Sequence, residues 1–325
     1  MDKSKVFVTV AMGNYYCYLA ENLYKSYKLF KNNDLPFYVV TDSLGERHFN
    51  SRKLFDGIKT IEYPKYNFLD KLEIYNLLDF DEIIFIDADC FICGDIVFLF
   101  DLFEKNKSEV SCLGVWNDIG KRKGSYEYTN YFNNIAIEKF GLKKYIQLEG
   151  GLYYFRHSHI ADEIMSFATQ QLDPHYDEFG LNRQGGGQKS DECVFNVAMG
   201  VFGMNPLGNS DHKIMDYVYR VNMYGYNYKW HKIKWKPNIE CFKVISCTED
   251  NQKFKRDILI PHWTTVFSKT ISYYYFSCLI DCKYKRYGKI KTTIIVFDKM
   301  LLHLLKKTTD KIKRRIATKN KNGNT

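Results

Sequence analysis

The sequence predicts an α/β fold in which a mostly parallel sheet is flanked by helices. Short apolar runs that favour strands alternate with segments whose apolar residues recur at helical spacing, the order expected of crossover units. One run, Ile83 to Ile86, is continuously apolar, which is typical of a strand buried on both faces. It stops at Asp87 and Asp89, and open α/β sheets bind ligands at the carboxyl ends of their strands.

Each further element is expected from a local pattern. Strands are expected at residues 5–10, 36–40, 59–63, 111–116, 150–155, 201–206 and 258–263, all short runs rich in apolar side chains. Helices are expected at residues 15–31, 46–55, 70–78, 160–172 and 191–199, with Asp70 as an N-cap. Residues 117–141 are polar and lack a clear period, which predicts a loop. No GxGxxG motif follows the first strand, so a Rossmann dinucleotide site is not indicated.

The positive charge is concentrated at the C-terminal end. The chain carries a net charge of +9, but residues 283–325 hold 14 Lys or Arg and 2 Asp, which leaves −3 for residues 1–282. Apolar residues between 290 and 305 fit one helical face, and lysines fill much of the rest. We therefore expect a basic amphipathic tail that binds an anionic membrane surface, or alternatively a helix packed on the body. The nearly neutral body gives no indication of a nucleic-acid partner.

The cysteines and the N-terminus favour a reducing, cytosolic compartment. The chain has nine cysteines, an odd number, and it begins without a secretory signal. Cys90 and Cys93 form a C-x-x-C motif, but no second pair follows, so we interpret them as ordinary strand cysteines rather than as a zinc site. No apolar run reaches the roughly 20 residues that a membrane span needs.

Asp87 and Asp89 are candidate ligands for a divalent cation. Side chains two apart on a strand point the same way, so the two carboxylates would converge. Two carboxylates at close range repel each other, and a divalent cation removes the conflict because its preferred ligands are hard oxygens. A diphosphate would complete the coordination of that cation. An acidic turn after the strand is the alternative interpretation.

Four motifs together resemble glycosyltransferase family 8, the retaining enzymes of GT-A fold that include glycogenin and the lipopolysaccharide galactosyltransferases. The stretch from Lys71 through Asp87-Ala88-Asp89 to Gly94-Asp95-Ile96 resembles the family's lysine-containing helix, Asp-x-Asp strand and following segment. Three more motifs follow in the family's order, at Glu149 to Phe155, Asp191 to Asn196 and His262-Trp263. The resemblance spans about residues 5–269, so we expect a GT-A domain at 1–269 and the basic helical tail at 270–325.

The resemblance implies a role for each matching residue. Asp87, Asp89 and His262 would hold Mn²⁺ or Mg²⁺, and Lys71 would contact the donor phosphate or sugar. Asp191 would line the sugar pocket and act in catalysis with Lys71. The nucleotide sugar would be bound by Thr9, Ala11, Tyr15, Lys71, Asp87, Ala88, Asp89 and Lys269, with Tyr15 or Tyr16 stacking on the base.

Simpler interpretations stand beside these roles. His262 could be a hydrogen-bonded histidine at a strand end, Lys71 a solvated helix lysine, and Asp191 with Glu192 a helix cap.

The chain also departs from the family in two places. Glu149 stands where the family has Asn, so it would contact sugar hydroxyls or act as a nucleophile in a double displacement. The family's glycine after the histidine is missing, and Lys269 stands one place late.

The expected function is metal-dependent transfer of a hexose from a nucleotide-diphosphate sugar, a UDP-sugar by the resemblance, to a glycan or lipid-linked acceptor. Retention of configuration and a place in surface polysaccharide or lipopolysaccharide synthesis are expected, on the inner face of the membrane. Two alternatives remain open: a non-catalytic nucleotide-sugar-binding protein, and a peripheral membrane protein whose tail is the functional part.

Overall fold

The computed structural model describes most of the first two thirds of the chain and little of the rest. The described residues are 4–120, 128–184, 187–208, 214–217, 243–247, 253–257, 260–262, 277–278, 280–281, 284–285, 295 and 298. The chain divides into two compact units, one of Met1–Asp216 with Ile258–His262 and the other of Tyr217–Asp257 with Trp263–Thr325. In the second unit, β8 (Lys243–Cys247) and β9 (Lys253–Asp257) pair antiparallel.

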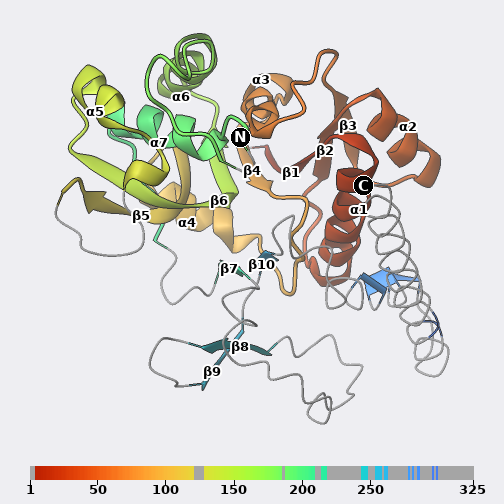
Figure 1. Cartoon of the computed structure of the whole chain (residues 1–325). Coiled ribbons are helices and arrows are strands. Elements are labelled where there is room, and N and C mark those ends of the chain that lie inside the picture. Colours follow the sequence, from red (N-terminus) through yellow and green to blue (C-terminus); the bar gives the residue numbers. More distant parts are fainter. Residues whose placement is uncertain are drawn as a thin grey trace, which may run out of the picture. The chain divides into compact units, whose positions relative to one another are not determined.

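The first unit is built on a six-stranded sheet with the order β3-β2-β1-β4-β6-β5 (Figure 1). The strands are β1 (Lys5–Ala11), β2 (Phe37–Thr41), β3 (Gly57–Thr60), β4 (Glu82–Ile86), β5 (Val110–Asp118) and β6 (Lys144–Arg156). The pairs β3–β2, β2–β1 and β1–β4 are parallel, whereas β6 runs antiparallel to both β4 and β5. The predicted α/β class, with a mostly parallel sheet, is confirmed.

Helices cover both faces of the sheet (Figure 1). On one face lie α1 (Gly13–Phe30) and α4 (Phe98–Asn106). The ring centroid of Phe7 in β1 lies 5.5 Å from that of Tyr27 in α1 and 5.1 Å from that of Phe100 in α4. The other face packs against several shorter helices that share one apolar core with the sheet. These are η1 (Phe68–Glu73), α3 (Ile74–Leu77), α5 (Asn134–Phe140), α6 (His159–Ser166), the π-helix η3 (Phe167–Leu172) and α7 (Asp191–Val201). The first unit also contains α2 (Ser43–Arg52), which contacts α1, and η2 (Tyr128–Asn130).

Strand β4 lies inside the sheet, between β1 and β6, and all five of its residues are buried. A strand covered by helices on both faces has no polar side, which is why Ile83 to Ile86 shows no alternation. The prediction of a doubly buried strand that leads into Asp87 is therefore confirmed.

Strand β6 differs from the expectation at 150–155, because it is 13 residues long and the glycine pair lies inside it. Cys112 of β5 pairs with Tyr153, but the next residue, Leu113, pairs with Glu149. The three residues Gly150, Gly151 and Leu152 therefore bulge out of the β5–β6 ladder. Glycine inside a strand often marks such a bulge or a close approach of other groups.

Three other expectations need correction. Residues 201–206 form the end of α7 and a turn at Gly203 (φ +67°) rather than a strand. The expected loop at 117–141 contains η2 and α5, while its residues 121–127 lie outside the described ones. The N-cap of the helix at 68–73 is Asn67, and Asp70 instead completes a capping box as the third helical residue.

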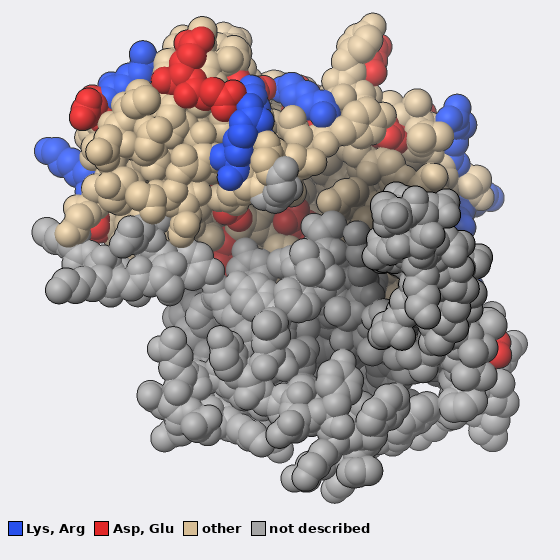
Figure 2. Space-filling model, in the orientation of Figure 1, with Lys and Arg blue, Asp and Glu red and all other residues tan. Residues whose placement is uncertain are grey.

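The predicted tail at 270–325, the domain boundary at 269 and Lys269 lie almost entirely outside the described residues, so these remain predictions. No helix in the described part of the chain is long and apolar enough to cross a membrane. On the described face shown in Figure 2, Lys and Arg side chains are interspersed with Asp and Glu.

Candidate active site

The candidate site is built around a tight turn that follows β4. The Asp87 N–H donates to the Gly151 carbonyl of β6 (2.9 Å), so Asp87 continues the strand pairing by one residue. The Cys90 N–H then donates to the Asp87 carbonyl (3.1 Å), which closes the turn over Ala88 and Asp89. Asp89 and Cys90 are buried, and Asp87 is partly exposed. Both carboxylates thus lie at the carboxyl end of the strand, but the turn brings Asp89 there, because the strand does not continue through it as expected.

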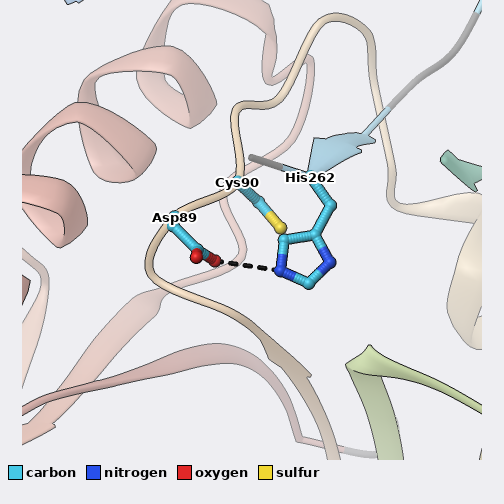
Figure 3. Close-up of side chains that lie close together, drawn as sticks. All are labelled: Asp89, Cys90 and His262. Atoms are coloured by element: carbon cyan, nitrogen blue, oxygen red, sulfur yellow. Dashed lines mark ion pairs between the residues drawn. The ribbon is translucent and has the colours of Figure 1, made fainter. Parts of the chain in front are cut away.

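His262 reaches these carboxylates from a distant part of the sequence. It ends β10 (Ile260–His262), which pairs with β7 (Met215–Tyr217). Its Nε2 lies 3.0 Å from Asp89 Oδ1 (Figure 3) and 3.6 Å from Asp87 Oδ2. Burial lowers the pKa of His262, but the two carboxylates, Asp89 foremost, more than offset this and the pKa is raised overall. The three predicted metal ligands therefore lie together at the carboxyl end of β4.

Lys71 links Asp87 to Asp191. It lies on η1 with 9% of its surface exposed, so it is not a solvated helix lysine. Its Nζ lies 2.9 Å from Asp87 Oδ1 and 3.1 Å from Asp191 Oδ2, and it also donates to the Gly150 carbonyl (3.5 Å). Burial lowers the pKa of Lys71, but the two carboxylates raise it well above its usual range. Lys71 is therefore a charged ammonium group that forms salt bridges with both Asp87 and Asp191.

Asp191 is the first residue of α7, and only 2% of its surface is exposed. The N-cap of α7 is Ser190, and no side-chain capping bond is present. The Asp191 carboxylate instead pairs with Lys71 and accepts a hydrogen bond from the Tyr153 hydroxyl (2.7 Å). Asp191 therefore faces the Asp87 side of the site, and it does not cap its helix.

The glycine pair in β6 creates room for two site residues. A Cβ atom on Gly151 would lie 2.8 Å from His262 Nδ1 and 2.8 Å from Met215 Sδ. A Cβ atom on Gly150 would overlap the Glu192 carboxyl group. Because real Cβ atoms do not approach other atoms this closely, both side chains depend on glycine at these positions.

Glu192 also lies at the site, although the sequence analysis considered it only as part of a possible helix cap. It follows Asp191 in α7, is partly buried, and packs against Gly150. Burial, followed by the charge of Asp191, raises its pKa to about 7, well above the ordinary 4.5. The available signal was its position in the Asp191 motif, where the resembling family has Gln.

Glu149 is buried in β6 beside the bulge, with 8% of its surface exposed. Its charge and that of Glu192 both act on the Cys112 thiol, whose pKa is raised chiefly by burial. Both carboxyl groups are therefore close enough to Cys112 to interact with it electrostatically. No described contact joins Glu149 to Lys71, Asp87 or Asp191, so its part in the site stays a prediction.

The residues expected to bind the nucleotide lie at the carboxyl end of β1, beside β4. Val8 pairs with Phe85, and this register carries both strands to the same edge of the sheet. Thr9 and Ala11 are fully buried, and the Thr9 hydroxyl has no hydrogen-bond partner among the described residues. Tyr15, at the start of α1, is partly exposed and meets Tyr16 edge to face (5.7 Å between ring centroids). Among these, Tyr15 and Tyr16 have surface available to a ligand.

The donor atoms fit a divalent cation. Asp87 and Asp89 supply the carboxylate oxygens that Mg²⁺ and Mn²⁺ prefer, and an imidazole nitrogen is a common transition-metal ligand. Lys71 holds Oδ1 of Asp87, and Oδ2 faces His262. One oxygen of Asp87 is therefore turned toward the place where the three candidate ligands meet.

No protein-family model matches the chain, and no curated protein sequence matches it. Among solved structures, the galactosyltransferase LgtC in complex with donor and acceptor sugar analogs is similar over 90% of this chain and 95% of its own, with 12% identity and a TM-score of 0.48. Mouse xyloside xylosyltransferase 1 is similar over 80% of this chain and 98% of its own (9% identity, TM-score 0.45). The glycosyltransferase GlyE of Streptococcus pneumoniae is similar over 88% of this chain and 65% of its own (13% identity, TM-score 0.48). Similarities at this level establish neither substrate nor mechanism, so the proposed function rests on the site itself.

Proposed function

We propose that this protein is a metal-dependent glycosyltransferase of GT-A type. It would move a hexose from a nucleotide-diphosphate sugar, a UDP-sugar by its resemblance to family 8, to a hydroxyl of a glycan or a lipid-linked acceptor. One observation carries the proposal: Asp87, Asp89 and His262 converge at the carboxyl end of β4, and Lys71 joins this group to Asp191. These are residues from three of the four motifs that resemble the family.

The site residues divide the work of breaking the bond between sugar and diphosphate. Asp87, Asp89 and His262 would hold Mn²⁺ or Mg²⁺, which when bound supplies Lewis-acid stabilisation of the charge that develops on the leaving phosphate. Lys71 adds a second positive charge in a buried position, where electrostatic stabilisation is strongest. Lys269 would add a third. Asp191 would accept hydrogen bonds from donor-sugar hydroxyls.

Retention of configuration would follow from attack by the acceptor hydroxyl on the face that the diphosphate leaves. In that route the leaving phosphate takes the acceptor proton, and no protein base is required. The alternative is a double displacement with Glu149 as nucleophile. Glu149→Gln separates the two: a modest loss of transfer supports a sugar contact, and a complete loss with no glycosyl-enzyme intermediate formed supports the nucleophile.

A panel of UDP-sugars, assayed for hydrolysis with Mn²⁺, Mg²⁺ or EDTA, tests the proposal. We expect hydrolysis of at least one donor that needs a divalent cation and is lost in Asp89→Asn. Asp101→Asn, at an exposed carboxylate on α4, is the matched control and should keep full activity. Full activity in excess EDTA would refute the metal role. Donor binding without hydrolysis or transfer would favour the non-catalytic nucleotide-sugar-binding protein.

The tail leads to a proposal about location. With a net charge of +12, residues 283–325 would hold the enzyme on the anionic inner face of the membrane, where lipid-linked acceptors for surface polysaccharide or lipopolysaccharide are built. Each Lys or Arg near such a surface adds about 1 kcal/mol of attraction. The protein should float with acidic vesicles at low salt, and deletion of 283–325 should release it without loss of donor hydrolysis. Failure of the full-length chain to bind acidic vesicles would refute this proposal alone.

A further inference from the structure

Cys90 lies directly beside the proposed metal ligands. Cys90 and His262 form an isolated antiparallel β-bridge, and side chains of such directly opposed residues are close neighbours. Asp89 precedes Cys90 in the turn after β4. The ligand atoms of Asp89, Cys90 and His262 all lie within 4.8 Å of one another, and Figure 3 shows the Cys90 sulfur turned toward the imidazole ring.

The three side chains offer one oxygen, one sulfur and one nitrogen. Mg²⁺ and Mn²⁺ favour oxygen ligands, whereas thiolate sulfur selects softer cations. Zn²⁺ binds Cys, His and Asp side chains, usually with tetrahedral geometry. We propose that Asp89, Cys90 and His262 form a site for a thiophilic divalent cation such as Zn²⁺, with the fourth position open to water or a phosphate oxygen. The proposal concerns cation binding alone and does not depend on the proposed glycosyl transfer.

The salt bridges of the site allow Asp89, Cys90 and His262 to bind a cation without the help of Asp87. Asp87 Oδ1 is held by Lys71 at 2.9 Å, so Asp87 already has a buried counter-charge. The imidazole lies closer to Asp89 (3.0 Å) than to Asp87 (3.6 Å). A cation between Asp89, Cys90 and His262 therefore leaves the Lys71–Asp87 pair intact. On binding, the Cys90 thiol gives up its proton to the buffer, and the sulfur donates to the cation as a thiolate.

The two cation sites share Asp89 and His262, so they exclude each other. Occupation by Zn²⁺ removes two of the three ligands that the proposed Mn²⁺ or Mg²⁺ site needs. Zn²⁺ should therefore displace Mn²⁺ from the protein, with Cys90 as the residue that decides between them. This competition can be measured by binding, without any assay of activity.

Cobalt reports on the sulfur ligand directly, because Co²⁺ bound to thiolate has a charge-transfer band in the near ultraviolet. The reduced, metal-free full-length protein is titrated with Co²⁺ and then with Zn²⁺. We expect a saturable band that Zn²⁺ abolishes, and we expect Cys90→Ser to lack it. Cys93→Ser is the matched control, since it removes the other cysteine of the same C-x-x-C motif, and it should keep the band. Absence of the band in the parent protein, or a band of equal intensity in Cys90→Ser, overturns the proposal.

A second measurement needs no variant and covers the case in which Cys90→Ser fails to fold. X-ray absorption at the zinc edge, on protein loaded with one equivalent of Zn²⁺, should show one sulfur ligand at about 2.3 Å beside nitrogen and oxygen ligands. A shell of nitrogen and oxygen alone overturns the proposal. Neither result bears on donor hydrolysis, so this proposal and the proposed function fail separately.

Discussion

The carboxyl group of Glu192 allows a quantitative test of the electrostatics of the site. Glu192→Gln removes the charge and keeps the shape, so contacts with Gly150 should survive. The pKa of Glu192 is raised to about 7 chiefly by burial and then by Asp191, while Lys71 acts in the opposite direction. The ordinary value is 4.5. The carboxyl group is therefore destabilised in its charged form when the protein is folded.

The sign of the pH dependence follows from proton counting. Between pH 4.5 and 7, the folded protein holds a proton on Glu192 that the unfolded chain has released. The stabilisation from this proton is fully present below pH 4.5 and is lost as the pH rises through 7. At about 1.4 kcal/mol per pKa unit, the full shift corresponds to about 3 kcal/mol. Because Glu192 is only partly buried, solvent screening reduces this to roughly 1–3 kcal/mol.

Urea unfolding of the metal-free protein at pH 5 and pH 8 measures the effect. From pH 5 to pH 8 the parent should lose roughly 1–3 kcal/mol more unfolding free energy than Glu192→Gln. The reason is that glutamine has no proton to release over this range. Glu138→Gln, at an exposed position on α5, should show no such gain. Parallel pH profiles for the parent and Glu192→Gln would refute the raised pKa and the close packing that causes it.

Three further outcomes are expected. Lys71→Met leaves the buried Asp191 carboxylate and the partly exposed Asp87 carboxylate without their counter-charge, so it should lower the unfolding free energy by about 3–5 kcal/mol at neutral pH and by less in acid. An unchanged urea midpoint would contradict these two salt bridges. In Gly151→Ala the added methyl group would press against the His262 ring, so Mn²⁺ binding measured by calorimetry should weaken at least about tenfold. Unaltered affinity would remove His262 from the ligand set. Tyr153→Phe deletes the hydrogen bond to Asp191 and should cost about 1.5–3 kcal/mol of stability by thermal unfolding, whereas no loss would show that the bond contributes nothing.

The sequence alone determined the central part of the fold and the position of two proposed metal ligands, Asp87 and Asp89. A strand that is covered on both faces has to be apolar throughout, so the run from Ile83 to Ile86 could be recognised without knowledge of its neighbours. Asp87 and Asp89 follow it directly, and the position of a residue at a strand end is a local property. The alternation of strands and helices over the first 86 residues has the same local origin.

Only the tertiary structure decided how the rest of the site comes together. Strand β6 is also buried on both faces, so its pattern cannot distinguish antiparallel from parallel pairing, and the bulge at 150–152 depends on the register with β5. The pairing of Lys71 with Asp191 and the approach of His262 to Asp89 join residues that are more than 100 positions apart in the chain. The raised pKa of Glu192 likewise arises from burial and neighbouring charges. Such long-range contacts leave no periodic pattern in the sequence, because they depend on how whole strands and helices pack against one another.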